Sequence, residues 1–257
     1  MFYVLDKQKI IAYGVSVLTV LFLFCMASEM TTEKEAIQTS ANNQRLLPIY
    51  KVQTEKNEVA FTMNCAWNAD DIDSILDTLE KNDTKITFFI VGDWMEKYPE
   101  EVKKIHKAGH EIASHSDTHP HVTNMSYEDN VNELEKSNEK LEKIIGTKTN
   151  IYRAPYGEYN NTVIQAAQDK KYFTIQWSLD TLDYTGLTGE EMWKRLEKVE
   201  KGDIILSHNG TKHTADSLDM LIKNIKQKGL KIVKVSELIY KDNYTINSEG
   251  RQIKNNV

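Results

Sequence analysis

The sequence predicts an α/β protein, a distorted (β/α) barrel of about seven parallel strands that follows one N-terminal transmembrane helix. Strand-like and helix-like segments alternate between residues 57 and 240, as they do when helices wrap a parallel sheet. Strands such as TFFIV and DIIL are continuously apolar, which is typical of strands that are covered on both faces. An uncharged apolar run at residues 10–27 approaches the roughly 20 residues that cross a bilayer.

Charges of opposite sign flank the apolar run. Lys7 and Lys9 precede it and Glu29 and Glu33 follow it, so residues 1–9 are predicted to be cytoplasmic and everything after residue 28 extracytoplasmic. A cleaved signal peptide is the alternative, since Ala27 could end a cleavage site. The bulky residues before Ala27 favour a retained anchor, and hence a single-pass protein of the cell membrane.

The rest of the chain divides into a polar stalk at residues 28–56, a barrel domain at residues 57–240 and a loose polar tail at residues 241–257. The predicted strands of the barrel are residues 58–65, 85–92, 111–116, 151–157, 172–180, 203–210 and 231–238. The predicted helices are residues 70–82, 98–109, 126–146, 160–171, 189–202 and 214–229.

The composition restricts the possible functions. Hydrophobic residues make up 40% of the 257 residues, enough for a substantial core. A net charge of -6 argues against nucleic-acid binding. The two cysteines, Cys25 in the apolar run and Cys65 in the barrel, cannot pair within one chain. Cys65 is therefore free, buried or bound to a ligand.

Polar residues follow the predicted strands at the points where they end. In (β/α) barrels the chemistry lies at the carboxyl ends of the strands, so these residues are expected to meet at one rim. They are Asn64, Cys65, His115, Arg153, Tyr156, Asp180, Asp183 and His208.

Two histidine pairs have the same spacing. His115 and His119, in SHSDTH, follow a strand and could aim two imidazoles at one metal ion. His106 and His110, in IHKAGH, lie among lysines at the end of a helix. We interpret this second pair as surface or capping histidines.

Three further motifs have both functional and purely structural interpretations. Arg153 in YRAPYG could hold a carboxylate or simply precede a turn. The aspartates of WSLDTLDY could cap a helix or form a turn. His208 in LSH, at the end of a buried strand, could be a satisfied core residue if taken alone.

Taken together in this order and spacing, HSDTH, RAPYG, WSLDTLDY and LSH resemble the polysaccharide deacetylases with a NodB-homology domain, carbohydrate esterase family 4. The resemblance covers residues 57–240 and is closest to the membrane-anchored, sporulation-associated branch. It implies a NodB-type distorted barrel that uses a divalent metal, commonly zinc, to hydrolyse N-acetyl groups of cell-wall glycan such as peptidoglycan.

The resemblance also implies roles for individual residues. His115 and His119 would be metal ligands, and His208 would be the general acid that protonates the leaving amine. Asp183 would orient His208 and raise its pKa.

Four more residues acquire roles in the same way. Arg153 would orient the catalytic base, and the backbone N–H of Tyr156 would stabilise the oxyanion. Leu206 would line the pocket for the acetyl methyl group. Tyr184, at a position where the family often has tryptophan, would form an aromatic wall.

The first motif departs from the family. The stretch AFTMNCAW aligns with a family Thr-Phe-Asp-Asp, so Asn64 replaces the base and Cys65 replaces the third metal ligand. A carboxamide cannot take a proton from water at useful pH. Cys65 either joins the histidines as a thiolate ligand or is a small buried apolar residue. Asp70 and Asp71 are explained by helix capping.

Two functions follow from these motifs. The first is an extracytoplasmic, metal-dependent polysaccharide deacetylase, weakened by Asn64. The second is a catalytically inactive NodB-type domain that binds wall polysaccharide or scaffolds wall or spore assembly. A zinc peptidase is disfavoured because the sequence has no HExxH helix. The expected partners are wall polysaccharide and the membrane, with a monomeric chain and no nucleic acid.

Overall fold

The structure, a computed structural model, describes residues 16–24, 26 and 45–255. The chain divides into two units, residues 1–45 and 46–257. In the first unit, residues 16–24 and 26 are helical. Among the described residues no helix is both long and apolar enough to span a bilayer. Residues 1–9 and part of the predicted transmembrane segment 10–27 lie outside the described residues.

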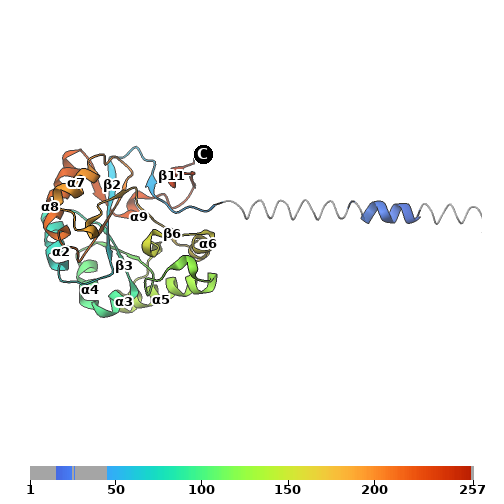
Figure 1. Ribbon diagram of the computed structural model, residues 1–257, viewed down its shortest axis with the longest axis horizontal. Helices are drawn as coiled ribbons and strands as arrows, with labels where there is room; N and C mark the ends of the chain where they lie inside the picture. Colours follow the sequence, from blue (N-terminus) through green and yellow to red (C-terminus); the bar gives the residue numbers. More distant parts are fainter. Residues whose placement is uncertain (1–15, 25, 27–44, 256–257) are drawn as a thin grey trace, which may run out of the picture. The chain divides into compact units, whose positions relative to one another are not determined.

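The second unit is built on a sheet of parallel strands (Figure 1). Seven strands lie in one row, and an eighth, β9, pairs with the first half of β2. The pairings are all parallel within the described sheet, so the parallel α/β prediction is confirmed as a half-barrel. In spatial order the strands are β6 (Phe173–Thr174), β5 (Ile151–Tyr152), β4 (Glu111–Ser114), β3 (Thr87–Ile90), β2 (Glu58–Cys65), β8 (Ile204–His208) and β7 (Leu179–Asp180), with β9 (Lys231–Val233) beside β2.

All six predicted helices form, within a few residues of the expected bounds. The longest, α5, begins after Ser126, whose side chain accepts a hydrogen bond from the Asp129 N–H, and ends at Gly146 in the left-handed conformation. The helices are α2 (Ile72–Lys81), α3 (Gly92–Lys97), α4 (Pro99–Lys107), α5 (Tyr127–Ile145), α6 (Asn161–Asp169), α7 (Gly189–Leu196), α8 (Thr214–Gln227) and α9 (Val235–Leu238), with 3-10 turns η1 (Val122–Asn124), η2 (Pro155–Gly157) and η3 (Asp183–Thr185).

Besides residues 151–157, which form β5 and then the 3-10 turn η2, two predicted strands are divided in the structure. Residues 172–180 were expected as one strand but form β6 and β7, which lie at opposite edges of the sheet. Residues 231–238 form β9 followed by the short helix α9. In both segments the apolar run fits a strand, and only the neighbouring strands decide where pairing stops.

The central strand β2 carries the core on one face and the site on the other. Val59, Phe61, Met63 and Cys65 pack into a large apolar cluster with the helices. The intervening residues point to the opposite face, as the twofold periodicity of a strand requires. Asn64 therefore faces the inside of the half-barrel.

The predicted stalk at residues 28–56 is wrong for its last residues, because the chain from residue 46 onward belongs to the folded unit. Ile49 bridges to Ile175 beside β6, and Lys51 bridges to Asp203 beside β8. Ile49 and Val52 are buried. This segment lies between the two sides of the open sheet, and its apolar sequence LLPIYKV is consistent with a short strand or packing segment within the predicted stalk.

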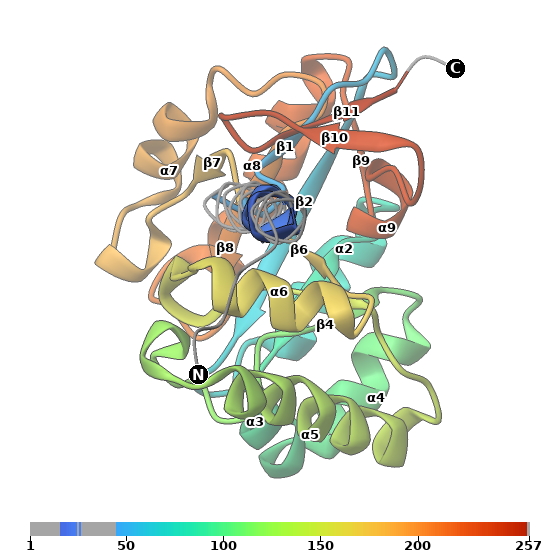
Figure 2. The same cartoon turned by 90° about the vertical axis from the view of Figure 1, so that its right-hand side faces the viewer.

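The predicted loose tail, residues 241–257, is also wrong for most of its length. Strands β10 (Tyr244–Ile246) and β11 (Arg251–Lys254) form an antiparallel hairpin, and β1 (Lys51–Val52) pairs with β11 in parallel. Gln252 is fully buried and exchanges two hydrogen bonds with the backbone of Tyr240. The resulting small sheet lies at the end of the unit away from α3 and α5 (Figure 2).

The interpretation of His106 and His110 as surface residues holds for His106 only. His110 is 5% exposed, and its Nδ1 accepts a hydrogen bond from the Ile86 N–H at 3.2 Å. Burial lowers the pKa of His110 to about 4. The turn after α4 directs this side chain into the core, which the surrounding lysines did not indicate.

Candidate active site

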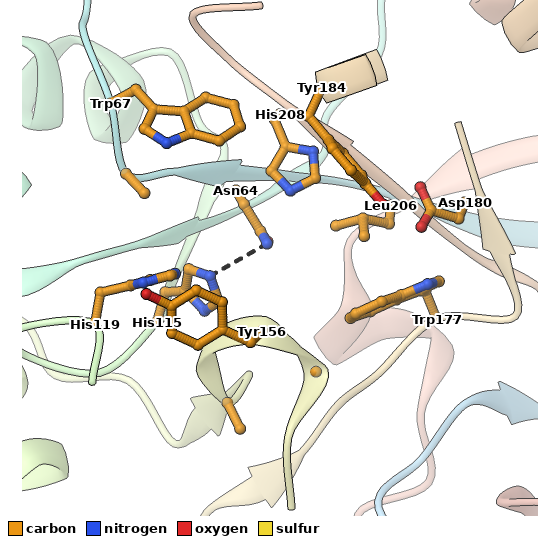
Figure 3. A pocket seen from close by; sticks show the side chains of 13 residues that line it. Asn64, Trp67, His115, His119, Tyr156, Trp177, Asp180, Tyr184, Leu206 and His208 are labelled. Carbon is orange, nitrogen blue, oxygen red and sulfur yellow. Dashed lines mark hydrogen bonds between the residues drawn. The ribbon is translucent and has the colours of Figure 1, made fainter. Parts of the chain in front are cut away.

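A pocket of about 520 Å³ opens at the carboxyl ends of the parallel strands. Its volume falls within the roughly 300–1,000 Å³ of small-molecule sites. Seven of the residues predicted for the site line it, from five separate parts of the fold (Figure 3). They are Asn64, His115, His119, Tyr156, Tyr184, Leu206 and His208.

Asp183 lies behind His208 and binds it closely. The Asp183 carboxylate accepts hydrogen bonds from His208 Nδ1 at 2.8 Å and from the His208 backbone N–H at 2.6 Å. It also accepts from the Thr214 hydroxyl at 2.7 Å and the Tyr184 N–H at 3.0 Å. Because Nδ1–H points at the carboxylate, Nε2 of His208 is left for the pocket.

The two histidines of SHSDTH come together as predicted, with ring centroids 4.9 Å apart. His115 Nδ1 lies 2.8 Å from the Arg153 carbonyl oxygen, so Nδ1 carries the proton and Nε2 the lone pair. Burial lowers the pKa of both imidazoles, that of His115 well below its ordinary value. The pair is therefore neutral near pH 7.

The loop that carries these histidines is held by a carboxylate from α5. Ser116 and His119 both have positive φ angles, 71° and 58°. Glu133 accepts hydrogen bonds from the Ser116 hydroxyl, from the N–H groups of Asp117 and Thr118, and from the Thr118 hydroxyl. Glu133 thereby fixes a backbone conformation that is unfavourable for residues other than glycine.

Asn64 joins His115 to Arg153. Its Nδ2 lies 3.2 Å from His115 Nε2, and its Oδ1 accepts from an Arg153 N–H at 2.9 Å. The amide nitrogen can only donate, so it points a hydrogen at the lone pair of His115. Asn64 is thus fully engaged as a neutral bridge.

Arg153 is completely buried, and its charge has no carboxylate partner within 4.0 Å among the described residues. Its hydrogen bonds go to Thr62, Asn64 and the Gln176 carbonyl. The guanidinium carbon lies 3.9 Å from the centroid of the Phe89 ring. Burial lowers the pKa of Arg153 to about 9, so it remains a cation at neutral pH.

Cys65 does not contribute to the pocket. It is fully buried in the apolar cluster on the helix side of β2, on the face opposite to Asn64. Burial raises the pKa of its thiol well above the ordinary value, which disfavours a thiolate. Of the two interpretations of Cys65, the structure supports the small buried apolar residue and not the metal ligand, because two consecutive strand residues point to opposite faces.

The residues of the pocket do not fit a three-ligand cation site. Among the described residues no group of three His, Cys, Asp or Glu side chains is placed to hold a metal ion. His115 Nε2 faces the Asn64 amide, and the nearby cation of Arg153 is attracted by a carboxylate, that of Asp180, only at longer range. Both features oppose a divalent cation between His115 and His119.

Among the lining residues to which the sequence assigned no role, three carry aromatic or charged side chains. Trp67 and Trp177 are aromatic walls, and Asp180 is a carboxyl whose pKa is raised by burial. The position of Trp67 at the pocket could have been predicted, since it lies two residues after the end of the strand that carries Asn64. Trp177 lies between the two segments of a divided strand, so its direction was not predictable.

The sequence matches the polysaccharide deacetylase family over residues 51–175. In structure, the folded unit superimposes on a CE4 family pseudoenzyme from Bacillus anthracis with a TM-score of 0.72, at 32% identity, over 76% of this chain and 69% of that chain. This chain belongs to the polysaccharide deacetylase family. A mutant of that CE4 pseudoenzyme, described as having restored enzymatic activity, matches equally well, with a TM-score of 0.72.

Two relatives are similar to this chain in sequence. Protein YlxY of Bacillus subtilis is 37% identical over 193 residues, which cover 75% of this chain and 60% of YlxY. A peptidoglycan-N-acetylglucosamine deacetylase of Bacillus cereus is 31% identical over 183 residues, 69% of this chain and 66% of the relative. The chain thus spans less than two thirds of either relative.

Proposed function

We propose that this polysaccharide deacetylase domain binds N-acetylated cell-wall glycan in its pocket without hydrolysing it. The observation that carries the proposal is the carboxamide bridge of Asn64 between His115 and Arg153. In this family the residue at the position of Asn64 would provide the catalytic base, whereas the Asn64 carboxamide carries no charge. The pocket itself is open and keeps its acetyl-facing residues, Leu206 and Tyr184.

The altered first motif supports binding better than catalysis. Asn64 cannot accept a proton from water, and Cys65 is directed into the core, so neither replaces the missing carboxylates. The Nε2 atom of His208, held in place by Asp183, can donate to or accept from a sugar hydroxyl or acetamide. The known members are generally metal-dependent, and the two aspartates of the family's first motif are replaced here by Asn64 and Cys65.

Slow deacetylation is the second candidate, and the intact Asp183–His208 pair favours it. His208 could still protonate a leaving amine while the base is absent. A general base typically contributes about 10²–10⁴-fold. If only the base has been lost, Asn64→Asp should therefore increase acetyl release by about that factor.

The cellular setting is part of the proposal. The uncharged run at residues 10–27, with lysines before it and glutamates after it, supports a membrane anchor with the glycan-binding domain on the extracytoplasmic side. Wall glycan is available on that side of the membrane. A role in spore formation rests only on the resemblance to the sporulation-associated branch.

The test compares chitotetraose with its fully de-N-acetylated form by isothermal titration calorimetry on the purified chain. We expect the acetylated sugar to bind more tightly, and mass spectrometry to show it intact after prolonged incubation. Equal affinity for the two sugars would contradict recognition of the acetamide. Loss of acetyl groups from the wild type, but not from His208→Ala, would establish deacetylation instead.

A further inference from the structure

Exposed aromatic side chains gather at the pocket and at no other place on the described part of the folded unit. Within residues 45–255 the exposed large hydrophobic residues are Trp67, Tyr156 and Tyr184, at 50%, 58% and 50% exposure. All three line the pocket. Isolated exposed aromatics are ordinary, whereas aromatics confined to one rim mark a binding surface.

The Trp67 side chain lies over His208, whose Nε2 atom faces the pocket. Its ring stacks on the imidazole of His208, with centroids 5.4 Å apart and planes 29° apart. Tyr184 contacts the same imidazole edge-on, at 5.3 Å. The side chain of His208 is 14% exposed, so one face of the Trp67 indole covers it while half of the Trp67 surface stays open.

The loop that carries Trp67 is firmly attached to the segment after β8. The Asn68 carbonyl accepts from Asn209 Nδ2 at 2.7 Å. Asp71 accepts from Asn209 Nδ2 at 3.1 Å and from the Gly210 N–H at 2.7 Å. These bonds fix the backbone that directly follows the indole, so a ligand would meet a surface that is already ordered, at a low entropic cost.

The position of Trp67 sets which part of a ligand it can reach. Leu206, which forms the floor of the pocket, is 2% exposed, whereas Trp67 stands at the rim, across the opening from Tyr156 (Figure 3). A sugar whose acetamide enters toward Leu206 leaves the next ring of the polymer outside the pocket. The apolar face of a pyranose can lie flat on an indole, because both surfaces are apolar and rigid.

We infer that Trp67 is a stacking platform for the sugar unit adjacent to the one whose N-acetyl group occupies the pocket. The inference rests on the proposed glycan binding and adds to it the class of ligand: an oligomer rather than a single amino sugar. Trp67 is thus a specificity-determining residue for chain length. Its contact with His208 holds the platform at the edge of the site.

The experiment measures the affinities of N-acetylglucosamine and chitotetraose for the wild type, Trp67→Ala and Trp67→Tyr. Loss of one aromatic contact should weaken tetramer binding by about three- to tenfold. Monomer binding should change by less than about twofold, and Trp67→Tyr should retain most of the tetramer affinity. Tyr127→Ala, an aromatic deletion on α5 away from the pocket, is the matched control and should bind both sugars like the wild type.

The outcomes separate the inference from the function on which it rests. If Trp67→Ala loses the same factor for monomer and tetramer, or loses neither, the platform is refuted while glycan binding stands. If the wild type binds neither sugar, the proposed function fails and the platform fails with it. Circular dichroism of each variant excludes unfolding as the cause of a loss.

Discussion

Replacing Asn64 with aspartate should stabilise the protein, because the change gives the buried guanidinium of Arg153 an anionic partner. Arg153 is fully buried, and one of its N–H groups already lies 2.9 Å from Asn64 Oδ1. Asparagine and aspartate have nearly the same shape. The substitution therefore adds a negative charge at a fixed distance from a positive one, without repacking.

The expected change in the free energy of unfolding is the sum of one favourable and two unfavourable contributions. Two unit charges about 4 Å apart attract by about 4 kcal/mol at an effective dielectric constant of 20. Burial of the new carboxylate opposes this by several kcal/mol, although the cost of burying Arg153 is already present in the wild type. The lost hydrogen bond to His115 removes about 1 kcal/mol. A burial cost at the lower end of that range, about 2 kcal/mol, leaves a net gain of about 1 kcal/mol, or about 2–4 °C in Tm.

The assay is urea denaturation of the wild type and Asn64→Asp at several pH values, with Asn64→Leu as the control that leaves Arg153 and His115 without partners. Arg153 lowers the pKa of the new carboxyl in the folded state, so the gain is present above about pH 4 and disappears as the pH falls through that lowered pKa. Asn64→Leu should lose about 2–4 kcal/mol. Destabilisation by Asn64→Asp at pH 7 would refute the reasoning that Arg153 is a buried cation without a directly bonded carboxylate.

Three further predictions concern side chains that are buried in the fold. Glu133→Gln should lower the free energy of unfolding by about 1–3 kcal/mol, because an amide oxygen replaces a carboxylate that accepts several hydrogen bonds from residues 116–118. The control Glu135→Gln, at an exposed position of the same helix, should change the free energy of unfolding little. Equal effects of the two substitutions would contradict the role of Glu133 in holding the loop. The pKa of His110 is about 4 in the folded state, so only the unfolded state takes up a proton between about pH 6.5 and 4. The free energy of unfolding of the wild type should therefore fall by about 3 kcal/mol over that interval, and that of His110→Asn by distinctly less. Identical shifts of the urea midpoint in the two proteins would contradict this. Cys65→Ala should cost about 1–2 kcal/mol through lost core packing and leave the zinc content unchanged, whereas loss of bound zinc would reinstate the thiol as a ligand.

The sequence was sufficient for the alternation of strands and helices, because apolar periodicity and capping residues are local signals. It could not reveal that residues 46–52 lie between the two sides of the sheet, since their partners Ile175 and Asp203 are more than 100 positions away. The hairpin of the tail was missed for a similar reason. Its strands are polar on one side and are stabilised by distant contacts such as that between Gln252 and Tyr240.

The site was predictable wherever one motif supplies one side chain to the rim. His115, His119, Asp183 and His208 met as their motifs indicate. Of the two interpretations of Cys65, the twofold periodicity of EVAFTMNC already favours the buried apolar residue, because it puts neighbouring residues on opposite faces. The unpaired charge of Arg153 became visible only when its neighbours were known in space.

The most direct test of the account is the zinc content of the purified chain after dialysis against zinc, measured by mass spectrometry beside His119→Ala. With the Asn64 amide directed at His115 Nε2 and the Cys65 thiol in the core, we predict well below one equivalent of zinc, the same in both proteins. One full equivalent in the wild type, lost in His119→Ala, would contradict the account.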